Sequence, residues 1–183
     1  TTHGYVDVGG GSISIGARND ADMFSSTVVS AWGVTGYTGS DNIVEYNGDV
    51  GINVDSVIET ANGDVRVAAG YDSAGNNGET YLKAHSLLAN STGFPISVHP
   101  EPEANVDIGA KVTVGSASNI KSDGDIYLLA NKGYVYADGY SEVNDWFNTI
   151  GDAFAPNQSI RGTEKIDALT DVEVQGTAET GIH

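Results

Sequence analysis

A turn followed directly by a strand is the unit that most constrains how this chain can fold, because the sequence contains it three times. The copies read "NGDVGINV" from residue 47, "NGDVRVAAG" from residue 62 and "DGDIYLLANKG" from residue 123. Gly beside Asn or Asp favours a tight turn, and the alternation after it places apolar side chains on one face of a strand. We therefore predict that each Gly-Asp pair marks a corner, after which Val65 and Val67 face the core and Arg66 faces outward.

Other short alternating runs fill most of the chain, with Gly, Asn, Asp or Ser between them. They begin at residues 12, 27, 42, 51, 64, 80, 95, 105, 125, 134 and 171. Many short β-type runs separated by turn residues are typical of an all-β protein. The 24 glycines agree with a chain of turns and strands rather than long helices.

The order of these runs repeats, which favours a stacked architecture. Residues 49–70 and 107–131 both read as a strand, a small polar turn, isolated apolar residues, a Gly-Asp turn and a second strand. We predict a parallel β-helix, or β-solenoid, whose coils of about 20 residues point Val, Ile, Leu and Ala inward. The 61-residue spacing between Asp64 and Asp125 would then span about three coils. An antiparallel β-sandwich is the structural alternative.

One segment departs from the alternating pattern. Residues 141–154 place Val143, Trp146, Phe147, Ile150 and Phe154 at helical spacing, with Ser141 at the expected N-cap. This pattern predicts a short α-helix that covers the β core. The predicted organisation is a solenoid over residues 1–140, a helical insertion or cap over 141–158, and further strands of the same domain over 159–183.

Several runs resemble the repeat regions of filamentous haemagglutinin-like adhesins, large exoproteins of the two-partner secretion type that include the leukotoxin-type filamentous adhesins. The runs are "GGSISIGARNDADMFSSTVV" from residue 10, "GDVRVAAG" from residue 63 and "ASNIKSDGDIYLLANKGYVYADG" from residue 117. The resemblance covers two separate ranges, residues 10–138 and residues 165–177. It implies a right-handed parallel β-helix, and the family has no catalytic residues to carry over.

Charge narrows the possible partners. The formal net charge is -17, with only 8 Lys and Arg residues, so phosphate-rich nucleic acids and anionic membrane surfaces are disfavoured. There is no Cys, which excludes disulfides and thiolate metal sites, and no apolar run reaches the about 20 residues of a membrane span. An acidic surface rich in Gly, Asn, Asp, Ser and Thr fits an extracellular or cell-surface setting.

No catalytic residue is predicted. The four histidines, at positions 3, 85, 99 and 183, lack metal-ligand spacing, and no nucleophile motif is present. Carboxylates cluster at Asp20/Asp22, Asp49/Asp55/Asp64, Asp72/Glu79, Glu101/Glu103/Asp107 and Asp123/Asp125. Such clusters keep open a carbohydrate-active β-helix enzyme, either a polysaccharide lyase or hydrolase or a phage depolymerase, because glycosidases use paired carboxyls.

Calcium is the only cofactor that the sequence suggests. The segment "DSAGNNGE" gathers the oxygen-bearing side chains of Asp72, Asn76, Asn77 and Glu79, which a hard cation prefers.

The favoured function is a non-catalytic, structural and adhesive segment of a secreted or cell-surface filamentous protein. A cell-surface receptor, a glycan or copies of the chain itself are the expected partners. Alternatives are the enzyme above and a self-assembling filament or surface-layer subunit.

Overall fold

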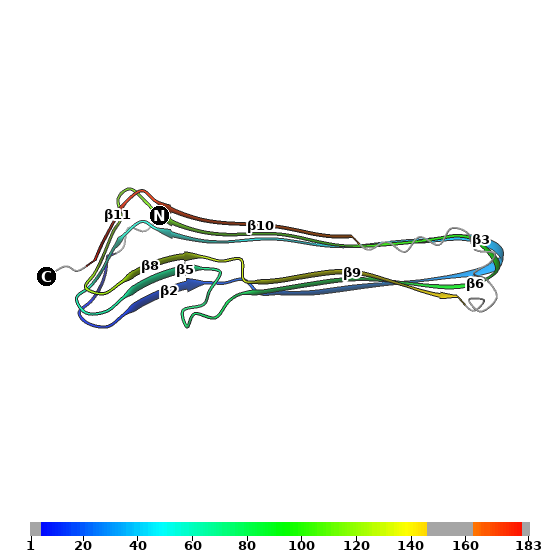
Figure 1. Ribbon diagram of the computed structural model, residues 1–183, viewed down its shortest axis with the longest axis horizontal. Coiled ribbons are helices and arrows are strands. Elements are labelled where there is room, and N and C mark those ends of the chain that lie inside the picture. Colours follow the sequence, from blue (N-terminus) through cyan, green and yellow to red (C-terminus); the bar gives the residue numbers. More distant parts are fainter. Residues whose placement is uncertain (1–4, 146–162, 181–183) are drawn as a thin grey trace.

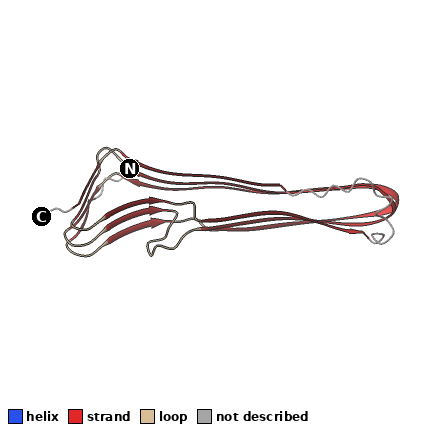
Figure 2. Cartoon of the chain, in the orientation of Figure 1, coloured by secondary structure: helices blue, strands red, loops and turns tan. Residues whose placement is uncertain are grey.

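In the computed structural model every described element is a β-strand (Figures 1 and 2). The structure describes residues 5–145 and 163–180, and the all-β prediction is confirmed for that part of the chain. The strands are β1 (Tyr5–Val8), β2 (Ile13–Ala17), β3 (Ala21–Val54), β4 (Val57–Thr60), β5 (Val65–Ala69), β6 (Glu79–Val114), β7 (Asn119–Ser122), β8 (Ile126–Ala130), β9 (Tyr134–Asp145), β10 (Thr163–Val174) and β11 (Thr177–Thr180).

These strands form three sheets, and neighbouring strands in every sheet are parallel. The orders are β1-β4-β7-β11, β2-β5-β8 and β10-β6-β3, with β9 also paired to β6. The chain thus visits the three sheets in the same order on each turn, an arrangement compatible with a β-solenoid. The antiparallel sandwich alternative is wrong.

The size of one turn differs from the prediction. Val65 pairs directly with Ile126, so a spacing of 61 residues is one complete turn of the chain and not three coils. The turn is longer than predicted because β3 and β6 each contain several of the short strands expected from the sequence. These two strands pair with each other from Ala21–Thr80 to Val54–Val114. Backbone groups at their Gly, Asn and Ser positions bond to the adjacent turn, so these residues do not end the strand.

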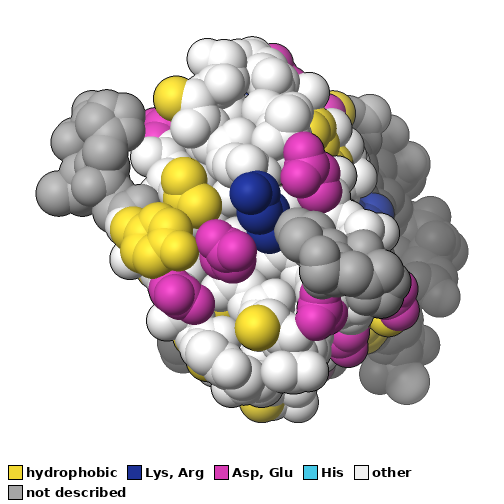
Figure 3. All heavy atoms as spheres, turned by 90° about the vertical axis from the view of Figure 1, so that its left-hand side faces the viewer, with side chains coloured by type: hydrophobic (Ala, Val, Ile, Leu, Met, Phe, Trp, Pro, Cys, Tyr) yellow, Lys and Arg dark blue, Asp and Glu magenta, His cyan; other side chains and the backbone are white. Residues whose placement is uncertain are grey.

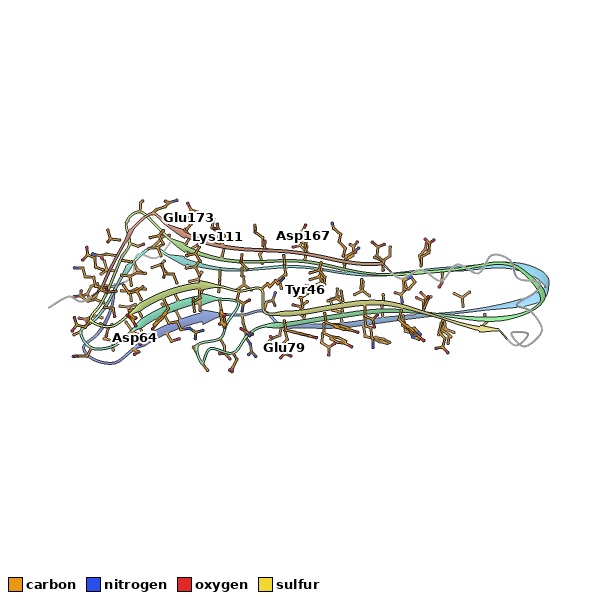
Figure 4. The ribbon with its side chains drawn as sticks, in the orientation of Figure 1. Tyr46, Asp64, Glu79, Lys111, Asp167 and Glu173 are labelled. Atoms are coloured by element: carbon orange, nitrogen blue, oxygen red, sulfur yellow. The ribbon has the colours of Figure 1, made fainter. Side chains whose placement is uncertain are left out.

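Each turn is therefore elongated. Figure 1 shows that β3 and β6 run out in one layer, bend at the far end and return in a second layer. Figure 4 shows Tyr46 between the two layers and Lys111 and Glu173 on the outside. Lys111 on β6 reaches β10, where its Nζ lies 3.0 Å from Asp171 Oδ2 and 2.8 Å from Glu173 Oε2.

The buried apolar residues form two clusters. One lies where all three sheets meet and consists of Ile13, Val54, Ile58, Val65, Val67, Ala69, Ala110, Val112, Val114 and Ile120. The other lies between the two layers of the long strands and consists of Val44, Leu82, Ala84, Ala104, Val106, Ile108 and Ala137. As predicted, Val65 and Val67 are fully buried, while Arg66 points outward and lies over the Tyr71 ring, 5.0 Å from its centroid.

The corner prediction is wrong for Gly48-Asp49, which lies within β3, and holds for the pairs at residues 63–64 and 124–125. There the corner is a ladder of hydrogen bonds between successive turns. The backbone N–H of Asp64 donates to Ser12 Oγ over 3.1 Å, and the N–H of Asp125 donates to Asp64 Oδ1 over 2.8 Å. Gly124 N–H also donates to the Gly63 carbonyl over 3.1 Å. The motif recurs because an oxygen-bearing side chain at this position satisfies a backbone donor of the next turn.

The helix predicted over residues 141–154 is wrong where the structure describes it. Residues 141–145 belong to β9, which pairs with β6 in register from Glu79–Tyr134 to Asn90–Asp145. The backbone of β6 offers hydrogen bonds to every second residue of a strand that pairs with it. This tertiary pairing overrides the local helical periodicity of residues 141–145. Residues 146–154 lie outside the described residues.

Inward-facing residues are more exposed at the end of the stack than inside it. Val172 and Val174 of β10 are 41% and 47% exposed, whereas their partners Val112 and Val114 on β6 are 0% exposed. The apolar columns therefore remain open at the β10 end.

Candidate binding surface

Most of the described aromatic side chains of the long strands lie on the outer face of β3, β6 and β9. Side chains of a strand alternate between faces, and Leu82 and Ala84 of β6 are buried, so their neighbours point outward. We call this surface the aromatic face; its ring-bearing residues are Phe24, Tyr81, His85, Tyr134, Tyr136 and Tyr140. Phe24, Tyr134 and Tyr140 are more than half exposed, at 65%, 61% and 51%.

Strand register stacks some of these rings. Asp22, Tyr81 and Tyr136 occupy one column across β3, β6 and β9. The rings of Tyr81 and Tyr136 are nearly parallel, at 7°, with centroids 4.6 Å apart. His85 and Tyr140 form a second pair, 5.1 Å apart and tilted by 30°. The rings are thus held in place by the sheet beneath them.

Charged side chains, among them Lys83 and Asp138, lie between the rings of the aromatic face. Lys83 Nζ is 3.9 Å from Asp138 Oδ2, and a hydrogen bond with Tyr81 is the main cause that raises the pKa of Lys83. Desolvation, and then the hydrogen bond from its hydroxyl to Asp138, raise the pKa of Tyr136. Lys83 is therefore an ammonium, and Tyr136 a neutral phenol, near neutral pH.

A groove of about 1060 Å³ opens beside Tyr81. The segment that connects β2 to β3, together with the start of β3, forms one side of the groove. The loop between β5 and β6, together with the start of β6, forms the other side. Its polar and aromatic lining residues are Arg18, Asp20, Asp22, Asn76, Asn77, Glu79 and Tyr81. Figure 4 shows Glu79 on the outside of the layer that contains the first half of β6.

Internal hydrogen bonds hold the loop that forms the groove wall. The Asp72 carboxylate accepts bonds from Ala74 N and Asn76 N, at 2.9 and 2.8 Å, and from Asn76 Nδ2 at 2.8 Å. Arg18 binds it at 3.2 Å and also binds Asp20 at 3.0 Å. Asn131 of the next turn donates to the loop's Asn77 over 3.2 Å.

These contacts give the loop an acid-sensitive anchor. The hydrogen bonds from Asn76, aided by Ala74 and Arg18, lower the pKa of Asp72. Its stabilising contribution is therefore complete above the unfolded pKa of about 3.9 and is lost as the pH falls through the lower folded pKa. We expect Asp72→Asn to lower the denaturation midpoint at pH 7, and to lower it by less as the pH falls below about 3.9. Asp123→Asn removes the same charge at an exposed position and should have no effect at pH 7; equal losses in both variants would contradict the role of Asp72.

The structure brings together two carboxylate clusters that are far apart in the sequence. Asp20 and Asp22 share the groove with Glu79, whose backbone N–H donates to Asp20 Oδ1 over 3.0 Å. The other clusters do not contribute to this groove. Asp72 lies behind the wall, where Arg18 connects it to Asp20.

The calcium hypothesis for Asp72, Asn76, Asn77 and Glu79 stays a prediction. Asn76, Asn77 and Glu79 line the groove, but the Asp72 oxygens already accept four donors, which a cation would have to displace. Among the residues whose side chains the structure describes, no three His, Asp or Glu are close enough together to hold a metal ion.

Sequence reasoning did not find the aromatic face. A signal was present in "YVYADGY" from residue 134, which places Tyr134, Tyr136 and Tyr140 at even spacing on one face of a strand. His85 lies outward between Ser26 and Tyr140, and its Nε2 is 4.0 Å from Glu142 Oε2.

Acidic side chains outnumber basic ones at one end of the molecule. Figure 3 views the end of the molecule that carries β11 and shows separate Asp and Glu side chains with few Lys or Arg between them. No described helix is long and apolar enough to cross a membrane. Comparisons with protein families, with curated proteins and with solved structures found no match.

Proposed function

We propose that the chain is a structural and adhesive segment of a secreted or cell-surface filamentous protein, without a catalytic role, folded as a right-handed β-solenoid. The observation that carries this proposal is the stacking of successive turns of about 60 residues in parallel register. Such a stack lengthens by adding turns, and each added turn buries the apolar columns of the turn before it.

The open end of the stack supports the same function. The columns through Val112 and Val114 continue to Val172 and Val174, which are half exposed at the last turn. A further turn of the same kind, from a longer chain or another copy, would bury these residues and extend the rod. The loops and the aromatic face would then recur along its side as contact points.

Antibodies against the purified chain test the proposal on cells of the source organism. We expect them to label intact cells, or fibrous material shed from them, while a cytosolic marker stays unlabelled. Labelling that requires permeabilisation would contradict the assignment to the cell surface.

A further inference from the structure

We propose that the groove beside Tyr81 binds a neutral saccharide chain, with one sugar ring stacked on the free face of Tyr81. This inference rests on the proposed adhesive function and names the ligand class. It starts from an incomplete column of rings on the aromatic face.

The column contains Tyr136 and Tyr81 on β9 and β6, and Asp22 in the next position on β3. The ring centroids are 4.6 Å apart, close to the about 4.8 Å between neighbouring strands, so the rings stack along the direction in which strands are added. One face of Tyr81 covers Tyr136, and the other faces the space above Asp22. The third position of the column, on β3, holds only the short Asp22 side chain and no ring. The groove lies at this position.

The groove has the size and rigidity of a ligand site. Its volume of about 1060 Å³ lies at the upper limit of the usual range for small-molecule sites. The Asp72 hydrogen bonds and the Asn131–Asn77 contact hold its wall, and strand pairing holds Tyr81. Binding therefore costs little ordering of the protein, which favours affinity.

The chemistry around the empty place selects a neutral sugar. A pyranose ring has an apolar face that packs on an aromatic ring, and hydroxyls that both donate and accept hydrogen bonds. Asp22 and Glu79 supply acceptors, and Asn77 supplies both an acceptor and donors. An anionic polymer would meet Asp20, Asp22 and Glu79 with only Arg18 to offset them, and Arg18 is already paired with Asp20 and Asp72.

Further rings of the aromatic face, beyond the groove, provide more positions for a saccharide chain. Tyr134 and Tyr136 lie on the same face two residues apart on β9, or about 7 Å, and Tyr140 lies four residues further along. A saccharide of several units that starts above Asp22 can thus meet more than one ring. This spacing favours an oligomer over a single sugar.

Binding to the purified chain tests the proposal directly. The probes are hexasaccharides of glucose, xylose and mannose, with hexagalacturonate as the anionic counterpart, and calorimetry measures their affinities. We expect at least one neutral hexasaccharide to bind, and Tyr81→Ala to weaken it by about tenfold or more, because the stacking surface is lost.

Asp22→Tyr is the sharper variant. It places a ring in the empty position, so we expect it to abolish binding while the denaturation midpoint stays equal or rises. Tyr5→Ala removes an exposed tyrosine from β1, in another sheet, and should leave the affinity unchanged. Binding that is equal in all three variants, or restricted to hexagalacturonate, or absent for every neutral probe, would overturn the proposal.

The outcome is separable from the proposed function. Surface labelling of cells without saccharide binding would leave the filament assignment intact and remove only this site. Chromatography of the probe after incubation should show it intact. Shortened products would support the site while contradicting the non-catalytic assignment.

Discussion

Replacing Gly70 with alanine is expected to lower the free energy of unfolding by at least about 3 kcal/mol. Gly70 has a φ of 84°, a left-handed conformation that costs other residues about 1–3 kcal/mol. A methyl group there would also overlap the backbone carbonyl of Asn131 in the next turn, so two turns would have to separate. Urea denaturation followed by circular dichroism measures the loss.

Gly51→Ala is the matched control. Gly51 lies within β3, and a methyl group there meets no atom within 4 Å. We expect its unfolding free energy to equal that of the natural chain or to rise slightly, since glycine weakens strand interiors. If the two variants had equal stability, the close approach of the turns at Gly70 would be refuted.

Val112→Asp should lower the unfolding free energy by at least about 4 kcal/mol, because it puts an unpaired charge at a fully buried position of the apolar column. Val112 is 0% exposed and lies between Ile52 of one turn and Val172 of the next. Val172→Asp makes the same change in the same column at the open end, where 41% of the residue is exposed. There we expect a loss below about 1 kcal/mol.

Should Val112→Asp fail to fold, Val112→Ala keeps the comparison measurable. Removing two buried carbon atoms should cost about 2–3 kcal/mol, against well under 1 kcal/mol for Val172→Ala. Thermal and chemical denaturation of both pairs provide the values. Equal losses at Val112 and Val172 would show that the column is not open at β10.

The sequence was most informative where the pattern is local. Alternation identified β5 and the burial of Val65 and Val67, and two of the three Gly-Asp pairs, at residues 63–64 and 124–125, identified true corners. It failed on the size of a turn because Gly48 and Gly109 interrupt a pattern without interrupting a strand. Whether such a residue ends a strand depends on the neighbouring turn, which lies about 60 residues away in the chain.

The same limit applies to the binding surface. Asp22, Tyr81 and Tyr136 belong to three different turns, and only the register of β3, β6 and β9 puts them in one column. The acidic residues of the groove were noted in the sequence as separate pairs, but their shared location was not apparent. The calcium site at the loop from Asp72 stays a prediction. What the sequence did not show is that the Asp72 oxygens accept hydrogen bonds from Ala74, Asn76 and Arg18.

The long pairing of β3 with β6 has a mechanical consequence. Its hydrogen bonds extend from Ala21–Thr80 to Val54–Val114 and point along the direction in which turns are stacked. Tension applied along that direction is shared by all of these bonds at once, and by those of the two smaller sheets. A filament of such turns would resist stretching along its axis, and would yield first where a single turn is peeled away from its end.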